Sequence, residues 1–115
     1  MSMTPEKKVK QKVAKQLKEM GAYFFYPATG GYGRSGVPDI VGCYDGKFFG
    51  IECKAGKNKL TALQERELGS IEKSAGIAMV VNEDNVTEIE LQFKTQILDQ
   101  KIVSWASDVA ELVSK

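Results

Sequence analysis

An Asp45-Gly46 pair, standing between two apolar strand-like runs at residues 37–44 and 47–54, constrains the fold of this chain most strongly. Asp-Gly in this setting is typical of a tight β-hairpin, because both central residues of the favoured turn need a positive φ. The sequence therefore predicts two antiparallel neighbours with a fixed register.

That register decides which side chains meet across the hairpin. With the turn at Asp45-Gly46, Asp39 faces Glu52, and directly opposed residues share one face of a sheet with Cβ atoms about 5 Å apart. Lys54 lies two residues beyond Glu52 and points to the same face. The opposite face is the predicted core side and carries Ile40, Phe49, Ile51 and Cys53.

Two opposed carboxylates repel, so positive charge is expected between Asp39 and Glu52. Lys54 supplies one charge, and a hard divalent cation such as Mg²⁺, which is often held by one or two carboxylates with water and phosphate oxygens, would supply two. A surface ion-pair cluster without chemistry is the alternative that spacing alone leaves open.

The rest of the chain predicts helices on either side of the hairpin. Thr4-Pro5 begins a helix that Gly21 ends, residues 22–26 form an aromatic strand, and Thr61 begins a second helix whose stripe runs through Leu68, Ile71 and Ala75 to Gly76. Residues 77–81 form a buried strand. Alternation from Thr87 to Lys94 predicts a half-exposed strand, and a short helix is expected around Trp105, Val109 and Leu112.

This order predicts a single α/β domain, residues 1–115, with a mixed central sheet flanked by helices. The chain has no histidine, which removes His-based acid/base catalysis and His-ligated zinc. Cys43 and Cys53 fall on opposite faces of the hairpin and are expected to be reduced. With no apolar run long enough for a membrane span and no secretory stretch, a cytoplasmic protein, without membrane contact, is expected.

Two polar residues interrupt the apolar stripes of the predicted helices. Glu6 lies on the stripe of the first helix, where it either faces inward or favours the helix dipole. Gln64 lies on the stripe of the second helix, where it either faces inward or completes a capping box with Thr61.

Net charge is only +1, so affinity for nucleic acid must come from clustered basic groups. Lys57 and Lys59 follow Lys54 in a loop, and Tyr32 and Arg34 stand in a glycine-rich loop before Asp39. Basic side chains and glycine amides suit phosphate contacts. An ordinary connection is the alternative for the glycine-rich loop, and most lysines of the first helix are read as a solvated face.

Gly36-Val37-Pro38-Asp39 followed by Glu52-Cys53-Lys54 after a hairpin resembles the PD-(D/E)xK nuclease motif. With the preceding glycine-rich loop and the following Gln64 helix, residues 6–81 resemble the virus-type replication-repair nuclease (VRR-NUC) family. Residues after 82 match nothing in that pattern.

The resemblance implies a restriction-endonuclease-like core and a phosphodiesterase that needs Mg²⁺ or Mn²⁺. It implies that Asp39, Glu52 and the Cys53 backbone carbonyl are metal ligands and that Glu6 acts through metal or water. It also implies that Lys54 orients or deprotonates the attacking water, with Gln64 as a helper nearby. These roles agree with what phosphodiester hydrolysis needs, which is an activated water and neutralised charge.

The hypothesis is a DNA endonuclease, structure-selective in the manner of a Holliday-junction resolvase or nicking, in DNA repair or recombination. Stand-alone members of the resembled family are dimeric, which implies a homodimer. Phe93, Ile97 and Trp105 are its interface candidates, with core packing the alternative for each. A restriction-type or exonucleolytic nuclease, a non-catalytic nucleic-acid-binding domain and a protein-interaction domain remain as rival readings.

Overall fold

The structure, a computed structural model, describes residues 3–28 and 35–114. Its elements are α1 (Pro5–Glu19), β1 (Tyr23–Phe25), β2 (Ile40–Tyr44), β3 (Lys47–Cys53), α2 (Ala62–Lys73), β4 (Ile77–Val81), the 3₁₀ turn η1 (Val86–Glu88) and α3 (Ile89–Val113). The described strands form a four-stranded sheet in the order β1-β2-β3-β4. β1, β2 and β3 are antiparallel neighbours, whereas β4 pairs parallel to β3 after the crossover through α2.

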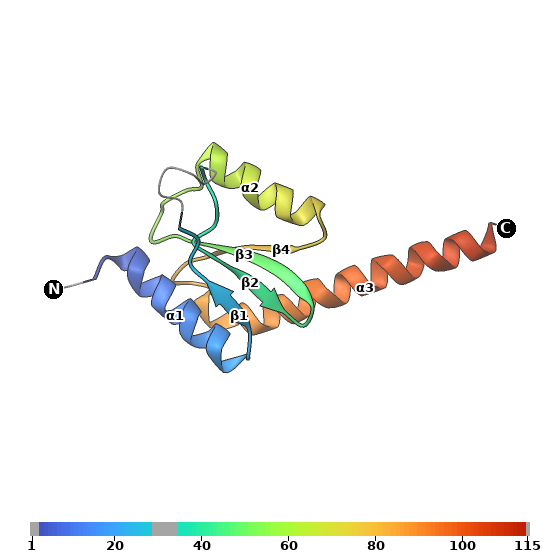
Figure 1. The fold of residues 1–115 in the computed structure, drawn as a ribbon, viewed down its shortest axis with the longest axis horizontal. Helices are drawn as coiled ribbons and strands as arrows, with labels where there is room; N and C mark the ends of the chain where they lie inside the picture. The colour runs from blue at the N-terminus through green and yellow to red at the C-terminus, as the bar shows by residue number, and fades with distance from the viewer. Residues whose placement is uncertain (1–2, 29–34, 115) are drawn as a thin grey trace.

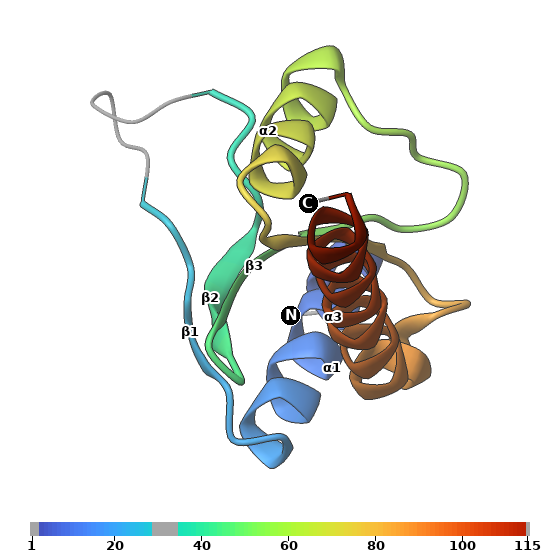
Figure 2. The same cartoon turned by 90° about the vertical axis from the view of Figure 1, so that its right-hand side faces the viewer.

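The helices lie on both faces of this sheet (Figure 1). α2 packs over β3 and β4 on one side, and α1 and α3 lie against each other on the other side, as the end-on view in Figure 2 shows. The predicted α/β class with a mixed, helix-flanked sheet is confirmed. Within the described residues, every helix is either too short or too polar to cross a bilayer.

The main core lies between the sheet and the α1–α3 layer. It contains the four hairpin residues predicted for the core face, Ile40, Phe49, Ile51 and Cys53, each fully buried. α1 adds Val9, Val13 and Leu17, and the Phe93 ring packs edge-on against Phe49 with ring centroids 5.0 Å apart. Glu52 alternates with Ile51 and Cys53 and therefore lies on the face of β3 that α2 covers.

Helix ends follow the sequence signals. The Thr4 hydroxyl accepts a hydrogen bond from the Lys7 amide, and α1 stops before Gly21, whose φ is +77°. At α2 the capping box is present in both directions between Thr61 and Gln64. α2 follows β3 in the chain after one loop. The cap at the start of α2 therefore determines the position of Gln64 relative to β3.

The predicted strand from Thr87 to Lys94 is wrong, because these residues form η1 and the first turns of α3. Ile89 and Phe93 fit a strand face and a helix face equally, so the short window was ambiguous. Leu91 separates the two, since a strand would bury it beside them, and it is 66% exposed. Helical spacing prevails because it brings Ile89, Phe93 and Ile97 together into the core.

The C-terminal helix is much longer than the short segment predicted around Trp105. α3 runs for 25 residues, and its second half projects away from the domain in Figure 1. Of the three proposed interface residues, Phe93 and Ile97 belong to the core, whereas Trp105 is 67% exposed. The core alternative therefore holds for the first two only.

Two predicted boundaries also shift. β2 begins at Ile40 rather than at Val37, because Pro38 cannot donate to a strand ladder. Ala75, predicted on the buried stripe of α2, lies beyond the helix end, exposed and with a φ of +67°. The buried Gly76 then leads directly into β4.

Candidate active site

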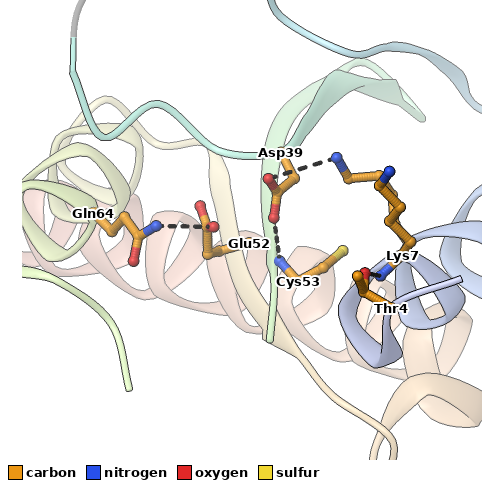
Figure 3. Close-up of polar contacts among 7 residues, drawn as sticks. Thr4, Lys7, Asp39, Glu52, Cys53 and Gln64 are labelled. Atoms are coloured by element: carbon orange, nitrogen blue, oxygen red, sulfur yellow. Dashed lines mark hydrogen bonds and ion pairs between the residues drawn. The ribbon is translucent and has the colours of Figure 1, made fainter. Parts of the chain in front are cut away.

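The hairpin has the predicted register. Tyr44 pairs with Lys47 and Ile40 with Ile51, and the turn residues Asp45 and Gly46 have φ values of +51° and +76°. One step beyond the last pair, this register places Asp39 opposite Glu52. Figure 3 shows the two carboxylates at this end of the hairpin, Asp39 just before β2 and Glu52 on β3.

Asp39 is held in place by the neighbouring strand and by helix α1. Its Oδ2 accepts a hydrogen bond of 2.8 Å from the Cys53 amide (Figure 3), and its Oδ1 lies 3.7 Å from the Lys10 ammonium. The Lys10 ammonium also lies 5.6 Å from the centroid of the Tyr26 ring. The Asp39 carboxylate is therefore oriented before any ligand arrives.

Lys10 was not predicted as a site residue, because most lysines of α1 were expected on its solvated face. A signal was present, because Lys10 follows Glu6 by one helical turn and adjoins the buried Val9. Its side chain is only 35% exposed. The contact itself depends on how α1 packs beside the hairpin, which local spacing does not encode.

Glu52 is the most unusual residue of the site, because its side chain is almost fully buried on the α2 side of the sheet. It is 3% exposed, its Oε1 accepts a 3.1 Å hydrogen bond from Gln64 Nε2, and its buried Oε2 has no hydrogen-bond partner. Burial, reinforced by the negative charge of Asp39, raises the pKa of Glu52 to about 8. The positive charge near Glu52 is therefore too small to keep it ionised at neutral pH, and its Oε2 lacks a hydrogen-bond donor.

Gln64 performs both of the roles that the sequence left open. Its Oε1 accepts a 2.9 Å hydrogen bond from the Thr61 amide, which completes the capping box, while its Nε2 donates to Glu52. Because the amide group has an acceptor end and a donor end, the cap and the site contact coexist.

Lys54 and Glu6 lie close enough to act on Glu52 electrostatically. The positive charge of Lys54 lowers the pKa of Glu52, and the negative charge of Glu6 raises it. The half-buried Glu6 also lines a hollow of 470 Å³ between the start of α1 and the loop after β3. The inward-facing reading of Glu6 is therefore the one that its surroundings favour.

The basic loop after β3 forms the opposite wall of that hollow. Lys57 lines it, and the exposed Lys59 stands two residues further along the same loop. The Gly56 amide donates to both carboxylate oxygens of Glu83, at 3.0 Å each, which ties the loop to the segment after β4. Tyr32 and Arg34, the other predicted nucleic-acid contacts, lie outside the described residues.

The two cysteines are free and take opposite sides of the hairpin, as the register predicts. Cys43 is exposed, and Cys53 is buried in the core, where burial raises its thiol pKa to about 12. Among the described residues no cluster of three or more His, Cys, Asp or Glu side chains is grouped for metal binding. The side-chain ligands available at this site are thus the pair Asp39 and Glu52.

Comparison with solved structures shows which known fold this chain shares. No family model matches the chain, and no curated protein does. Among solved structures, one described as a VRR_NUC domain superimposes with a TM-score of 0.61 at 22% identity, and the match covers 76% of this chain and 97% of that one. The chain therefore has the fold of a VRR_NUC domain, which supports the resemblance found in its motif.

Proposed function

We propose that this chain is a Mg²⁺- or Mn²⁺-dependent DNA endonuclease of the VRR-NUC type. The observation that carries the proposal is the buried Glu52 carboxylate, which faces Asp39 and keeps one oxygen without a partner. A buried carboxylate beside a second one is costly as a bare anion, so Glu52 stays protonated in the metal-free protein, as its raised pKa indicates, and ionises when a cation joins the pair. The shared fold with a VRR_NUC domain supports the same reading.

The available donor set suits a hard cation. Asp39 and Glu52 would hold it, and the Cys53 carbonyl is directed to the same place, because the amide and carbonyl of one strand residue point to the same neighbour and this amide binds Asp39. Two carboxylates with water and phosphate oxygens are a common Mg²⁺ environment. When bound, the ion would lower the pKa of water and neutralise phosphoryl charge.

The other residues of the site have roles that do not require direct contact with the ion. Lys54 places a fixed positive charge where negative charge develops on the phosphoryl oxygens, and its ammonium can orient the attacking water. Gln64 holds Glu52 by donating to Oε1. Glu6 accepts from water in the adjoining hollow, and Lys57 and Lys59 bind the phosphate backbone.

A homodimer acting on branched or nicked DNA is part of the proposal. A two-fold axis relates two copies of the site, which suits two symmetric cuts in a junction. The motif resemblance to stand-alone VRR-NUC proteins supports this assembly and a role in repair or recombination.

The test is cleavage of a four-way junction, a nicked duplex and a linear duplex with Mg²⁺, Mn²⁺ or EDTA. Asp39→Asn, Glu52→Gln and Lys54→Ala are each expected to lower the cleavage rate at least about a hundredfold. Glu72→Gln and Lys73→Ala, exposed on the last turn of α2, are matched controls and should leave it unchanged.

The other outcomes identify the rival functions. DNA binding that weakens with salt, with cleavage by the wild type no faster than by Asp39→Asn, Glu52→Gln or Lys54→Ala, would indicate a nucleic-acid-binding domain. No salt-dependent DNA binding would indicate a protein-interaction domain. Cleavage of linear duplex in preference to both branched substrates would indicate a restriction-type or exonucleolytic enzyme.

A further inference from the structure

Along its length α3 presents an apolar stripe to solvent, and the second half of the helix projects from the domain. Every residue from 101 to 114 is exposed, and the helix leaves the domain body over this stretch (Figure 1). The stripe consists of Leu91, Leu98, Ile102, Trp105, Val109 and Leu112, of which Trp105 is 67% exposed and Leu112 69%. Exposed apolar surface that is continuous along an element marks an interaction site.

The stripe lies on the side of α3 that faces away from the domain. Ile89, Phe93 and Ile97 are buried against the core, whereas Leu91 and Leu98 on the same turns are 66% and 56% exposed. Successive helical residues are rotated by about 100°, so the two sets occupy nearly opposite faces. A second helix can therefore lie along the stripe without meeting the domain to which α3 belongs.

The spacing of the stripe is that of a two-stranded coiled coil. Leu98, Ile102, Trp105, Val109 and Leu112 recur at alternating steps of four and three residues, with Leu91 one heptad before Leu98. The β-branched Thr95, Ile102 and Val109 take the a positions, and Leu91, Leu98, Trp105 and Leu112 take the d positions. In parallel coiled coils this assignment favours dimers.

Charge supports the same pairing. In a parallel dimer the g residue of one helix meets the following e residue of the other. The first such pair is Lys94 at g and Asp99 at e, so each helix offers one cation to an anion of the other copy, whereas the later g residues Lys101 and Asp108 meet the uncharged Ala106 and Val113. In the single chain Lys94 lies 3.0 Å from Glu90 of its own helix, and pairing of two copies would redirect it to Asp99 of the other copy.

We infer that the stripe on α3 is the surface through which two copies of this chain pair, with their α3 helices parallel. An isolated helix as short as the projecting residues 101–113 is marginal in water, and burying the stripe against an identical one stabilises it. The inference deepens the dimeric part of the proposed function and rests on it. It does not depend on the chemistry of the carboxylate site.

The test is the solution mass of the full chain, measured by light scattering. The expected mass is twice that of one chain, falling to that of one chain for Ile102→Asp and Leu112→Asp. Val103→Asp is the matched control, because Val103 is 68% exposed on the same helix but lies off the stripe, and it should remain dimeric.

Cross-linking tests the orientation. In a Cys43→Ser background, Leu98→Cys is expected to form a disulfide between copies, because identical d positions meet only when the helices are parallel. A monomeric wild-type chain, a larger oligomer, an Ile102→Asp dimer, a monomeric Val103→Asp variant or absence of the Leu98→Cys cross-link would each overturn the inference. Helical content by circular dichroism and DNA cleavage, measured on the same samples, separate this failure from unfolding and from failure of the nuclease proposal.

Discussion

The side-chain amide of Gln64 joins the cap of α2 to the buried carboxylate of Glu52, accepting from the Thr61 amide at one end and donating to Glu52 at the other. A helix terminus and a site residue are thus positioned by one planar group. The orientation of α2 over the sheet and the geometry of Glu52 are consequently coupled.

Two substitutions can distinguish the role of Gln64 in the cap of α2 from its role as a donor to Glu52. Gln64→Glu keeps an oxygen for the cap but replaces the donor to Glu52 with a second carboxylate, so cleavage should fall at least about tenfold with little change in helix content. Thr61→Ala removes the other half of the cap and should lower the free energy of unfolding by about 1 kcal/mol. If both variants, measured under conditions where each is fully folded, lost the same activity, the cap and the contact with Glu52 would not be separate roles.

The raised pKa of Glu52 predicts a pH-dependent stability of the metal-free protein. The unfolded chain ionises this group from its ordinary value of 4.5, whereas the folded chain keeps it protonated until about pH 8. Between these values the folded state binds the extra proton, so stability falls as pH rises. The free energy of unfolding in EDTA should decrease by a few kcal/mol, on the order of 1.4 per pKa unit, across this window.

Glu52→Gln is the control for that profile, since it is neutral at every pH. The free energy of unfolding from its urea curves should stay constant between pH 5 and pH 8, apart from the change caused by other titrating groups. A wild-type stability that rises over the same window would contradict the assigned pKa direction.

Lys10 predicts competition with a divalent cation at Asp39. Its ammonium lies 3.7 Å from Oδ1, where it repels a second positive charge. Lys10→Met should therefore lower the Mg²⁺ concentration for half-maximal thermal stabilisation by about two- to fivefold, the range expected for a partly exposed ion pair. Lys15→Met, exposed on the same helix, should have no effect. Weaker Mg²⁺ binding in Lys10→Met would show that Lys10 supports the site instead.

The packing of α3 is tested by Phe93. This ring is fully buried and contacts Phe49 edge-on, so Phe93→Ala should lower the free energy of unfolding by about 3–5 kcal/mol. Val103→Ala, exposed on the same helix, should change it by less than about 0.5 kcal/mol. Denaturant titration checks both values, and similar effects at the two positions would contradict the helix register.

Much of the site could be predicted because its information is local. Asp45-Gly46 sets the turn, the turn sets the register, and side chains alternate along a strand, so the meeting of Asp39 with Glu52 follows from spacing alone. The capping box at Thr61 and Gln64 is equally local. The core face of the hairpin followed from the same alternation.

Tertiary structure decided the features that depend on which elements meet. The burial of Glu52, its unpaired oxygen and the approach of Lys10 to Asp39 arise where α2 and α1 close over the hairpin, and no neighbour in sequence determines them. Ile89 and Phe93 fitted two periodicities at once, and only the packing of Phe93 on Phe49 selected the helix. The sequence by itself determined the strand register and the helix caps, because these depend on residues a few positions apart. The electrostatic state of the site was decided by long-range packing, because desolvation depends on everything that surrounds a charge.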